Sequence, residues 1–260
     1  MRPHKSLDDK TILVIGAAGL IGRSIINAIL NSGAKVVALD MSVKGLNELK
    51  LYYGNRVSSY SIVDITDKKS LEDALVNAHI KLGSICGAVN ASYPRGAHYG
   101  VDFLDVNYDD FCENVTLHLG GFFLFMQLCA KYSLKYNLPF SLVNISSIYG
   151  SIAPRFDVYE ETSMTMPVEY AAIKSGIEHL SRYINSYMKG HHTLFRSNCL
   201  SPGGILSNQD KNFIKRYNKY CLSKGMLDAQ DIADPVIFLL SDASRYVVGQ
   251  NLIVDDGFSA

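Results

Sequence analysis

The chain has 260 residues, 48% of them hydrophobic and 19% charged, which is typical of a globular protein with a large core and argues against a disordered chain. Lys and Arg number 25, as do Asp and Glu, so the formal net charge is zero. Without a basic excess to bind a phosphate backbone, we expect no nucleic-acid partner.

The cysteines and the longest early hydrophobic run exclude further classes. The five cysteines are widely spaced and include no Cys-x-x-Cys pair, so we expect neither a disulfide framework nor a metal site. The apolar run 11–22 is too short to span a bilayer, is followed by Arg23 and lacks a signal-peptide cleavage pattern. We therefore expect no membrane partner and a reducing, cytoplasmic location.

Strand-like apolar runs alternate with longer segments of helical period, which predicts βαβ units and a parallel sheet. The predicted strands are 11–15, 35–40, 57–63, 85–90, 139–146, 193–200 and 251–254. The predicted helices are 20–30, 68–81, 108–135, 168–188, 210–221 and 231–240. No repeat or linker interrupts them. The sequence therefore predicts an α/β fold: a single Rossmann-type domain over residues 1–260, with a doubly wound parallel sheet of about seven strands and helices on both faces.

Three glycines follow the first predicted strand with the spacing Gly-x-x-Gly-x-x-Gly. Glycines at a strand–turn–helix junction let the backbone approach a pyrophosphate, which the free amides of the helix N-terminus attract. Simple packing glycines are the alternative interpretation. The predicted cofactor contacts in this turn are Gly16, Ala18, Gly19, Leu20, Ile21 and Gly22.

Asp40, at the end of the second predicted strand, indicates which dinucleotide binds. A carboxylate there accepts hydrogen bonds from the adenosine ribose and repels a 2′-phosphate. Met41, a further predicted contact, is followed by Ser42 and Val43, and Lys44 is the nearest basic residue. The pattern favours NAD over NADP.

Tyr170 and Lys174 are four residues apart, on one face of a predicted helix. A tyrosine phenol titrates near ~10, and an adjacent ammonium favours its phenolate. Such a pair can exchange a proton with a substrate hydroxyl while hydride moves to or from a nicotinamide. Ser147 follows the fifth predicted strand, at the sheet edge where ligands bind. A chance surface pair is the alternative.

These motifs resemble the short-chain dehydrogenase/reductase family, and the likeness runs along the whole chain. It rests on the glycine turn, Asp64-Ile65, Val89-Asn90-Ala91, Ser147, Tyr170, Lys174, Pro202-Gly203-Gly204-Ile205 and the segment from Gly249 to Gly257. By this resemblance, Ser147 would hydrogen-bond the reacting oxygen and Tyr170 would be the acid/base. Lys174 would bind the cofactor ribose and tune Tyr170.

The resemblance also implies more cofactor contacts and an oligomer. Asp64 and Ile65 would flank the adenine, Asn90 and Ala91 the ribose, and Ile205 the carboxamide. The full implied set is Asp64, Ile65, Asn90, Ala91, Ser92, Tyr170, Lys174, Pro202, Gly203 and Ile205. The helices predicted over 108–135 and 168–188 would form the interface of a homodimer or homotetramer, in keeping with the several apolar faces of the first helix.

The chain departs from the family pattern in four places. The glycine spacing resembles that of the longer, sugar-nucleotide branch. Val89 and Ser92 replace the first Asn and the Gly of the usual Asn-Asn-Ala-Gly. His118 stands where the family carries a structural Asn, and either replaces it in the proton relay or is a helix histidine without a catalytic part. The connection from Ser147 to Tyr170 is longer than usual.

Segments 91–100, 151–169 and 203–225 are expected to form the substrate pocket. The proposed substrate contacts are Arg95, Tyr149, Arg155 and Tyr159. Arginine forks suit phosphate or carboxylate, so a sugar, sugar phosphate or nucleotide sugar fits best. Stretches such as Ser147-Ile148-Tyr149-Gly150 also resemble bacterial flagellin-modification oxidoreductases associated with nonulosonate, sialic-acid-like sugar pathways.

The leading hypothesis is an NAD(P)-dependent enzyme that interconverts an alcohol and a ketone on a sugar-type substrate in surface-glycan synthesis. One alternative is an epimerase or dehydratase that retains its NAD, which the glycine spacing favours. A non-catalytic protein that senses dinucleotides is the other, and the presence of Ser147, Tyr170 and Lys174 argues against it.

Overall fold

The first strand shows why this chain forms a sheet covered on both faces. β1 (Thr11–Ile15) reads Thr-Ile-Leu-Val-Ile, and all five side chains are buried. Such a run of β-branched and aliphatic residues matches a strand that packs against helices on both sides. The computed structural model describes residues 6–191 and 193–260, so residues 1–5 and 192 of the predicted domain lie outside the described part.

Seven parallel strands form one sheet in the order β3-β2-β1-β4-β5-β6-β7. After β1 they are β2 (Lys35–Asp40), β3 (Ser59–Ile62), β4 (Gly87–Asn90), β5 (Phe140–Ile145), β6 (Phe195–Pro202) and β7 (Asn251–Val254). β2 and β4 pair with opposite sides of β1, so the sheet is doubly wound. The predicted fold class is confirmed, and the strand ends differ from the predicted ones by at most two residues.

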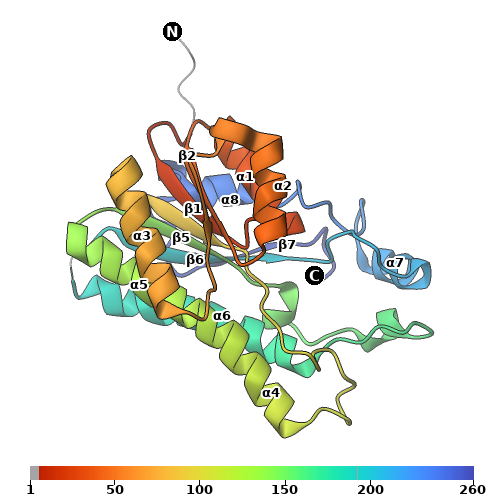
Figure 1. The fold of residues 1–260 in the computed structure, drawn as a ribbon. Helices are drawn as coiled ribbons and strands as arrows, with labels where there is room; N and C mark the ends of the chain where they lie inside the picture. Colours follow the sequence, from red (N-terminus) through yellow and green to blue (C-terminus); the bar gives the residue numbers. More distant parts are fainter. Residues whose placement is uncertain (1–5, 192) are drawn as a thin grey trace.

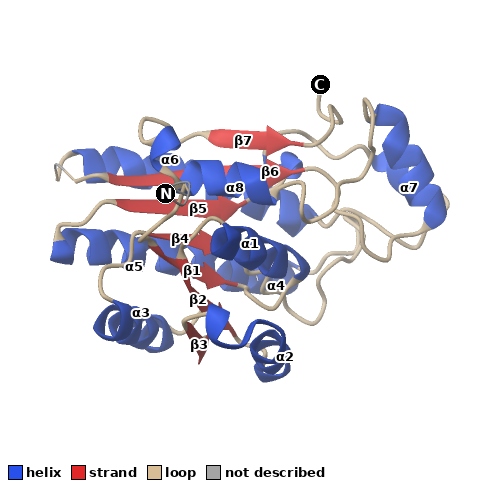
Figure 2. Cartoon of the chain, turned by 90° about the horizontal axis from the view of Figure 1, so that it is seen from above, coloured by secondary structure: helices blue, strands red, loops and turns tan. Residues whose placement is uncertain are grey.

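Helices cover both faces of the sheet (Figures 1 and 2). One face carries α1 (Leu20–Asn31), α2 (Val43–Tyr53) and α8 (Ala233–Leu240), and the other α3 (Lys68–Leu82), α5 (Gly121–Tyr136) and α6 (Val168–Lys189). The short α7 (Lys211–Tyr217) lies beyond the sheet edge. α2 was not predicted, because exposed Leu51 and Tyr52 blur its apolar period. Its start is nevertheless capped by Ser42, which accepts a hydrogen bond from the Gly45 amide at 3.0 Å.

The long helix predicted over 108–135 is interrupted. α4 (Tyr108–Asn114) and α5 are joined by a π-helical segment, η2 (Val115–Gly120). A π segment widens the helix by one residue per turn, is rare, and often lies at a functional site. Here it carries the buried His118. Sequence periodicity does not reveal such a segment, because one extra residue per turn only rotates the apolar stripe.

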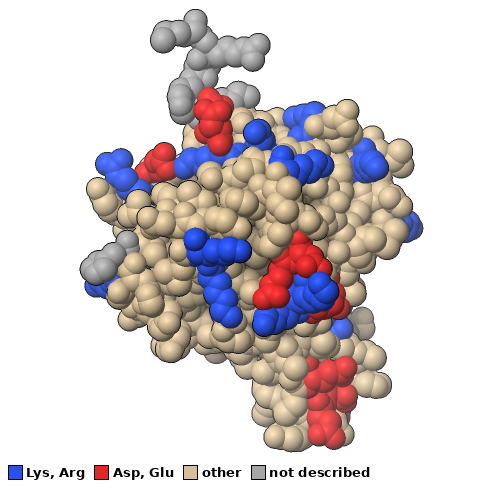
Figure 3. Space-filling view, turned by 60° about the vertical axis from the view of Figure 1, so that its left-hand side comes forward, with Lys and Arg blue, Asp and Glu red and all other residues tan. Residues whose placement is uncertain are grey.

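Three properties of the described residues bear on the classes considered above. No helix in the described part of the chain has the length and apolarity needed to cross a membrane. Among residues 6–191 and 193–260, no group of three or more His, Cys, Asp or Glu side chains could hold a metal ion. On the face shown in Figure 3, basic side chains are scattered, and several lie beside acidic ones.

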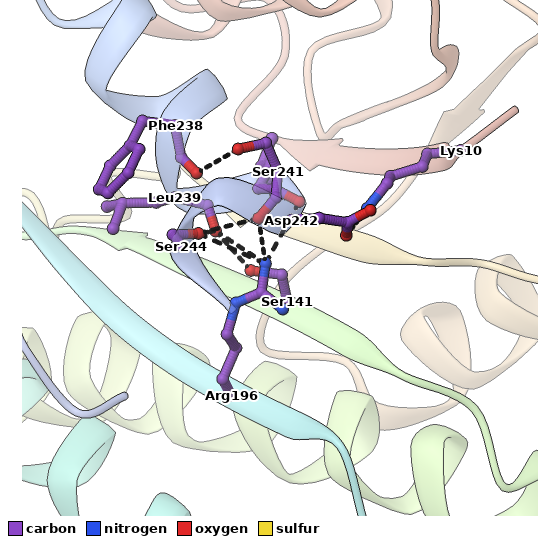
Figure 4. A network of polar contacts seen from close by, with 9 residues as sticks. Lys10, Ser141, Arg196, Phe238, Leu239, Ser241, Asp242 and Ser244 are labelled. Atoms are coloured by element: carbon purple, nitrogen blue, oxygen red, sulfur yellow. Dashed lines mark hydrogen bonds and ion pairs between the residues drawn. The ribbon is translucent and has the colours of Figure 1, made fainter. Parts of the chain in front are cut away.

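A buried arginine joins the end of α8 to β6 (Figure 4). The side chain of Arg196 is 8% exposed. Its Nη2 donates a hydrogen bond to the Ser241 carbonyl at 2.8 Å and also lies 3.3 Å from the Leu239 and 3.4 Å from the Leu240 carbonyl oxygen. The last carbonyls of a helix have no partner within the helix, so Arg196 adds a charged donor at the buried end of α8, where the Ser141 and Ser244 hydroxyls also donate to the Leu239 carbonyl.

We expect Arg196→Met to lower the free energy of unfolding by about 1–3 kcal/mol, because the carbonyls at the end of α8 lose a buried charged donor. Arg245→Met is the matched control, since Arg245 is exposed and contacts the Tyr246 ring. It should change the unfolding free energy by less than about 0.5 kcal/mol. Urea unfolding followed by circular dichroism measures both, and equal midpoints for Arg196→Met and the parent protein would contradict the assignment.

Candidate active site

The carboxyl ends of the parallel strands meet at one edge of the sheet, where ligands bind in open α/β folds. A cavity of about 730 Å³ opens there. Residues that follow β1, β4, β5 and β6 line it, together with the start of α6 and the segment around α7. The predicted pocket segments 91–100, 151–169 and 203–225 all contribute residues to its wall.

The glycine turn after β1 has no room for side chains at two of its positions. Gly16 has a φ of +77°, and a Cβ there would lie 2.4 Å from the Ala91 carbonyl oxygen. A Cβ on Gly22 would lie 2.1 Å from the Gly16 carbonyl oxygen. Gly19 is the N-cap residue of α1 and provides no side-chain cap, so the first amides of the helix remain available to an anion.

A second cavity of about 520 Å³ continues from the glycine turn to the end of β2. Asp40 lines it and is held firmly, because its Oδ2 accepts from the Ala18 amide and its Oδ1 from the Ser42 amide, both at 2.8 Å. The two cavities share Gly19, Ala91, Ser92 and Tyr93, so they form one elongated cleft across the turn. An elongated cleft that passes over a helix N-terminus, with a carboxylate at one end, fits a dinucleotide.

Most of the predicted cofactor residues lie along this cleft. Those around the cavity near Asp40 are Gly16, Ala18, Gly19, Asp40, Met41, Asp64, Ile65, Ala91 and Ser92. Those around the larger cavity are Leu20, Ile21, Tyr170, Lys174, Pro202, Gly203 and Ile205. Gly22 and Asn90 line neither cavity. Gly22 packs within the turn, and buried Asn90 accepts a hydrogen bond from the Ser92 hydroxyl at 2.6 Å.

Ser147, Tyr170 and Lys174 come together on the wall of the larger cavity. The Ser147 hydroxyl lies beside the Tyr170 phenol, close enough to lower the pKa of that phenol. Lys174 Nζ donates to the Ile145 carbonyl oxygen at 2.9 Å and lies 5.4 Å from the centroid of the Tyr170 ring. The Ile145 carbonyl ends β5, so one strand end positions both the serine and the lysine.

Burial controls the pKa of both ionisable groups. It raises the pKa of Tyr170, against the lowering effect of the Ser147 hydroxyl. It lowers the pKa of Lys174 to about 7, while the Glu178 carboxylate opposes the change. The sequence predicted that the Lys174 ammonium would lower the pKa of Tyr170. In the chain alone this pKa is raised instead, because desolvation is the larger effect. A neutral phenol in this position can donate a proton.

His118 lies next to the site but not on its wall. Its ring meets the Tyr93 ring edge-on, with centroids 5.3 Å apart, and Tyr93 meets the Tyr170 ring in the same way at 5.8 Å. Neither ring nitrogen of His118 has a hydrogen-bond partner among the described residues. Burial, with the Lys174 charge, lowers the pKa of His118, so its imidazole is neutral. This leaves both sequence interpretations open.

The substrate end of the cavity is aromatic and nearly uncharged. Tyr149 and Tyr159 line it as predicted, whereas Arg95 and Arg155 line neither cavity. The Arg155 guanidinium lies 4.4 Å from the centroid of the Tyr220 ring, so it stacks on an aromatic face. Of the described residues that line the larger cavity, Lys174 is the only one with a charged side chain.

Several wall residues were not singled out from the sequence. They are Ser163, Thr165, Gln209, Phe213, Tyr217 and Met226. Phe213 and Tyr217 are four residues apart on α7, a spacing that puts both on one face and was the available signal. Tyr217 stacks on Phe258 with ring centroids 4.1 Å apart, so the C-terminal segment supports this wall.

A family model described as enoyl-(acyl carrier protein) reductase matches residues 16–259. The chain belongs to the short-chain dehydrogenase/reductase family. The resemblance inferred from the sequence motifs is thereby confirmed.

Relatives and solved structures agree with this assignment to the short-chain dehydrogenases/reductases. Post-translational flagellin modification protein A of Campylobacter coli is 41% identical over 256 residues, covering 97% of this chain and 99% of that protein. Short-chain dehydrogenase reductase 5 of Arabidopsis thaliana is 29% identical, covering 97% and 95%. A short-chain dehydrogenase from Leptospira borgpetersenii, solved with bound NAD+, is 29% identical with a TM-score of 0.86 and coverages of 98% and 94%. This chain is an oxidoreductase that uses a nicotinamide dinucleotide.

Proposed function

We propose that this short-chain dehydrogenase/reductase interconverts an alcohol and a ketone on an uncharged, sugar-type part of its substrate. The observation that carries the proposal is the meeting of Ser147, Tyr170 and Lys174 on the wall of a cavity that continues into the dinucleotide cleft. A non-catalytic dinucleotide sensor has no use for a phenol, a hydroxyl and an ammonium in one place.

The proton follows a short path in the proposed reaction. When bound, the nicotinamide supplies or accepts the hydride. In the direction of ketone reduction, the Ser147 hydroxyl holds the carbonyl oxygen and the Tyr170 phenol gives it a proton. Lys174 stabilises the phenolate that remains, since its Nζ lies near the Tyr170 ring. His118 is the proposed relay residue, acting as a neutral imidazole through a water, because both of its nitrogens lack a partner among the described residues.

The nature of the cavity wall supports the sugar-type substrate. Tyrosine rings pack well against the apolar face of a sugar, and hydroxyl and amide side chains such as Ser163, Thr165 and Gln209 can bind its hydroxyls. Lys174 faces the reaction centre. No Arg among the described residues lines the larger cavity, so its wall offers no guanidinium to a phosphate. The flagellin-modification relative at 41% identity supports a role in surface-glycan synthesis. All five cysteines are unpaired, which fits a cytoplasmic location of the protein.

Asp40 favours NAD, and its replacement should shift cofactor choice. We expect Asp40→Ser to move the ratio of NAD to NADP affinity by about 10- to 100-fold toward NADP, because Arg23 and Lys44 line the same cavity and can then meet a 2′-phosphate. Asp64→Asn, on the same cavity, is the control and should affect both cofactors alike. Fluorescence titration with NADH and NADPH measures the ratio, and an unchanged ratio in Asp40→Ser would overturn the proposed recognition.

A homodimer or homotetramer is part of the proposal. α5 and α6 lie side by side on one face of the sheet, and large apolar or aromatic side chains remain exposed along them and at the nearby α4. These are Tyr108, Phe123, Tyr183 and Tyr187. Scattered single residues need no partner, but a row on adjacent helices suits a subunit interface. Light scattering should give at least twice the 28.7 kDa chain mass, and Phe123→Glu should reduce it; a monomeric parent protein would rule the oligomer out.

Turnover with a panel of substrates tests the proposed function. The protein is mixed with NAD and, separately, neutral sugars, sugar phosphates and nucleotide sugars, while nicotinamide absorbance and product are followed. Accumulation of NADH with a sugar supports the dehydrogenase. Product without net NADH would support the epimerase or dehydratase instead, and binding of NAD without any turnover would support the sensor.

A further inference from the structure

A buried carboxyl group on α6 lies next to the proposed reacting residues. Glu178 follows Lys174 by one helical turn, and its side chain is 5% exposed. Its Oε1 accepts hydrogen bonds from the Ser146, Ser151 and Ser201 hydroxyls, each at 3.1 Å, and its Oε2 accepts from Ser151 at 3.0 Å. A carboxylate is buried at reasonable cost only with such partners. The proposed reaction itself gives Glu178 no role.

Each of the three serines belongs to a different part of the site. Ser146 immediately precedes Ser147. Ser151 follows the 3₁₀ turn η3 (Ile148–Gly150), the turn that Ser147 begins. Ser201 is on β6, one residue before the cofactor-lining Pro202. Glu178 therefore joins the ends of β5, η3 and β6 to the helix that carries Tyr170 and Lys174.

Each serine hydroxyl has a single proton, so it can donate to Glu178 only when it does not donate to another acceptor. Ser146 can donate instead to the Lys174 carbonyl at 3.2 Å, and Ser201 to Asn251 Oδ1 at 2.7 Å. Ser151 accepts from Asn251 Nδ2 at 2.9 Å, so its own proton is free for Glu178. Ser151 is thus the constant donor, and the other two can alternate between acceptors. Bonds to an ionised carboxylate are about twice as strong as neutral ones, which favours Glu178 in that competition.

Gly150 makes this close approach possible. A Cβ on Gly150 would lie 2.5 Å from Glu178 Oε1 and 2.8 Å from the Lys174 carbonyl carbon. Any larger residue would push the turn that begins at Ser147 away from the helix. Gly150 therefore leaves room for both the Glu178 carboxylate and the backbone of α6 at Lys174.

Glu178 also supplies the negative charge near Lys174. The titratable groups that face Lys174 are Tyr170 and Glu178 on α6, His118 on η2, Tyr93 after β4 and Cys199 on β6. Burial raises the pKa of Cys199 and of the two tyrosines, so all three are neutral at neutral pH. Burial lowers the pKa of His118, so it is neutral too. Glu178 remains as the group that favours the ammonium against desolvation.

We propose that Glu178 is a positioning residue, which fixes Ser147 relative to Lys174 through the three serines and supplies the counter-charge of the lysine. The inference rests on the proposed function for its effect on turnover. Its first test does not need turnover, so the two can fail separately.

The first test follows the ionisation of Lys174. The protein is labelled with ¹³C-lysine, and the NMR signal of Lys174 is identified by its absence in Lys174→Met. Glu178→Gln keeps an acceptor oxygen but removes the charge, and Lys174 then loses its proton at lower pH. Lys174 should therefore titrate about one pH unit lower than in the parent protein. Glu72→Gln, on the exposed side of α3, is the control and should show no shift.

The second test separates the hydrogen bonds from the charge. Ser151→Ala removes the constant donor and leaves the carboxylate, so kcat should fall by about 10-fold with no shift of the Lys174 titration. Glu178→Gln should lose about 10-fold in kcat, and Glu178→Ala about 100-fold, with the KM for NAD within about threefold of the parent value. Ser151→Ala also serves if the Glu178 variants do not fold.

A purely structural role predicts other results. Lower thermal midpoints in the Glu178 variants, with the parent titration of Lys174 and the parent kcat well below those midpoints, would overturn the proposal. If the parent protein turns over no substrate at all, the proposed function fails, and the Lys174 titration still decides the role of Glu178.

Discussion

Tyr170→Phe should abolish turnover, with kcat lower by about 1,000-fold, while NADH binds with an affinity within about threefold of the parent's. Positioned acid–base catalysis contributes about 10²- to 10⁴-fold, and Tyr170 is the phenol that lies beside both Ser147 and Lys174. The change removes only the hydroxyl, so the ring keeps its edge-on contact with Tyr93 and its place near Lys174. Stopped-flow absorbance measures kcat, and fluorescence titration measures NADH binding.

Tyr246→Phe is the matched control, because Tyr246 is 86% exposed and lines neither cavity. It should turn over like the parent protein. The pH dependence adds a second check. Because burial raises the pKa of Tyr170, alcohol oxidation, which needs the phenolate, should become faster as the pH rises, whereas ketone reduction, which needs the phenol, should not. An undiminished kcat in Tyr170→Phe would refute the assigned acid/base.

Gly22→Ala should destroy the dinucleotide site and much of the stability of the fold. Its Cβ would lie 2.1 Å from the Gly16 carbonyl oxygen and 2.9 Å from Ala17, both backbone contacts that no side-chain rotation relieves. Overpacking of this kind costs about 1–3 kcal/mol, and the displaced turn no longer presents the first amides of α1. We expect NADH affinity to fall by about 100-fold or more.

Gly19→Ala provides the comparison within the same turn. Its Cβ would come no closer than 3.4 Å to the Gly16 carbonyl oxygen, and Gly19 has an ordinary extended backbone. The unfolding free energy should change by less than about 1 kcal/mol. Thermal unfolding and NADH titration of both variants give the answer. Equal stability of Gly22→Ala and Gly19→Ala would show that the turn is not as tightly packed as described.

The fold and the cofactor cleft could be predicted because their signals are local. A buried parallel strand requires an uninterrupted apolar run, and the glycine turn and Asp40 follow directly from the strands that they end. The positions of Ser147 and Tyr170 follow from their own strand and helix in the same way. These features depend on a few consecutive residues and on one rule about where parallel strands end.

Features set by tertiary contacts could not be predicted. Arg155 looked like a ligand for an anion, but its guanidinium lies over the Tyr220 ring, a partner far along the chain. The π segment around His118 rotates the helix by a fraction of a turn that periodicity does not resolve. No local pattern marks Glu178, because its three serine partners come from the ends of β5, η3 and β6.

The stacking of Phe258 on Tyr217 has a consequence for biosynthesis. The residues around the Asp40 end of the dinucleotide cleft come from the first part of the chain, so they emerge from the ribosome early, and domains generally fold from the N-terminal side during synthesis. The wall that α7 gives to the substrate cavity lacks its supporting ring until residue 258 is free of the ribosome. A newly made chain should therefore form the Asp40 end of the cofactor cleft before its substrate wall is complete.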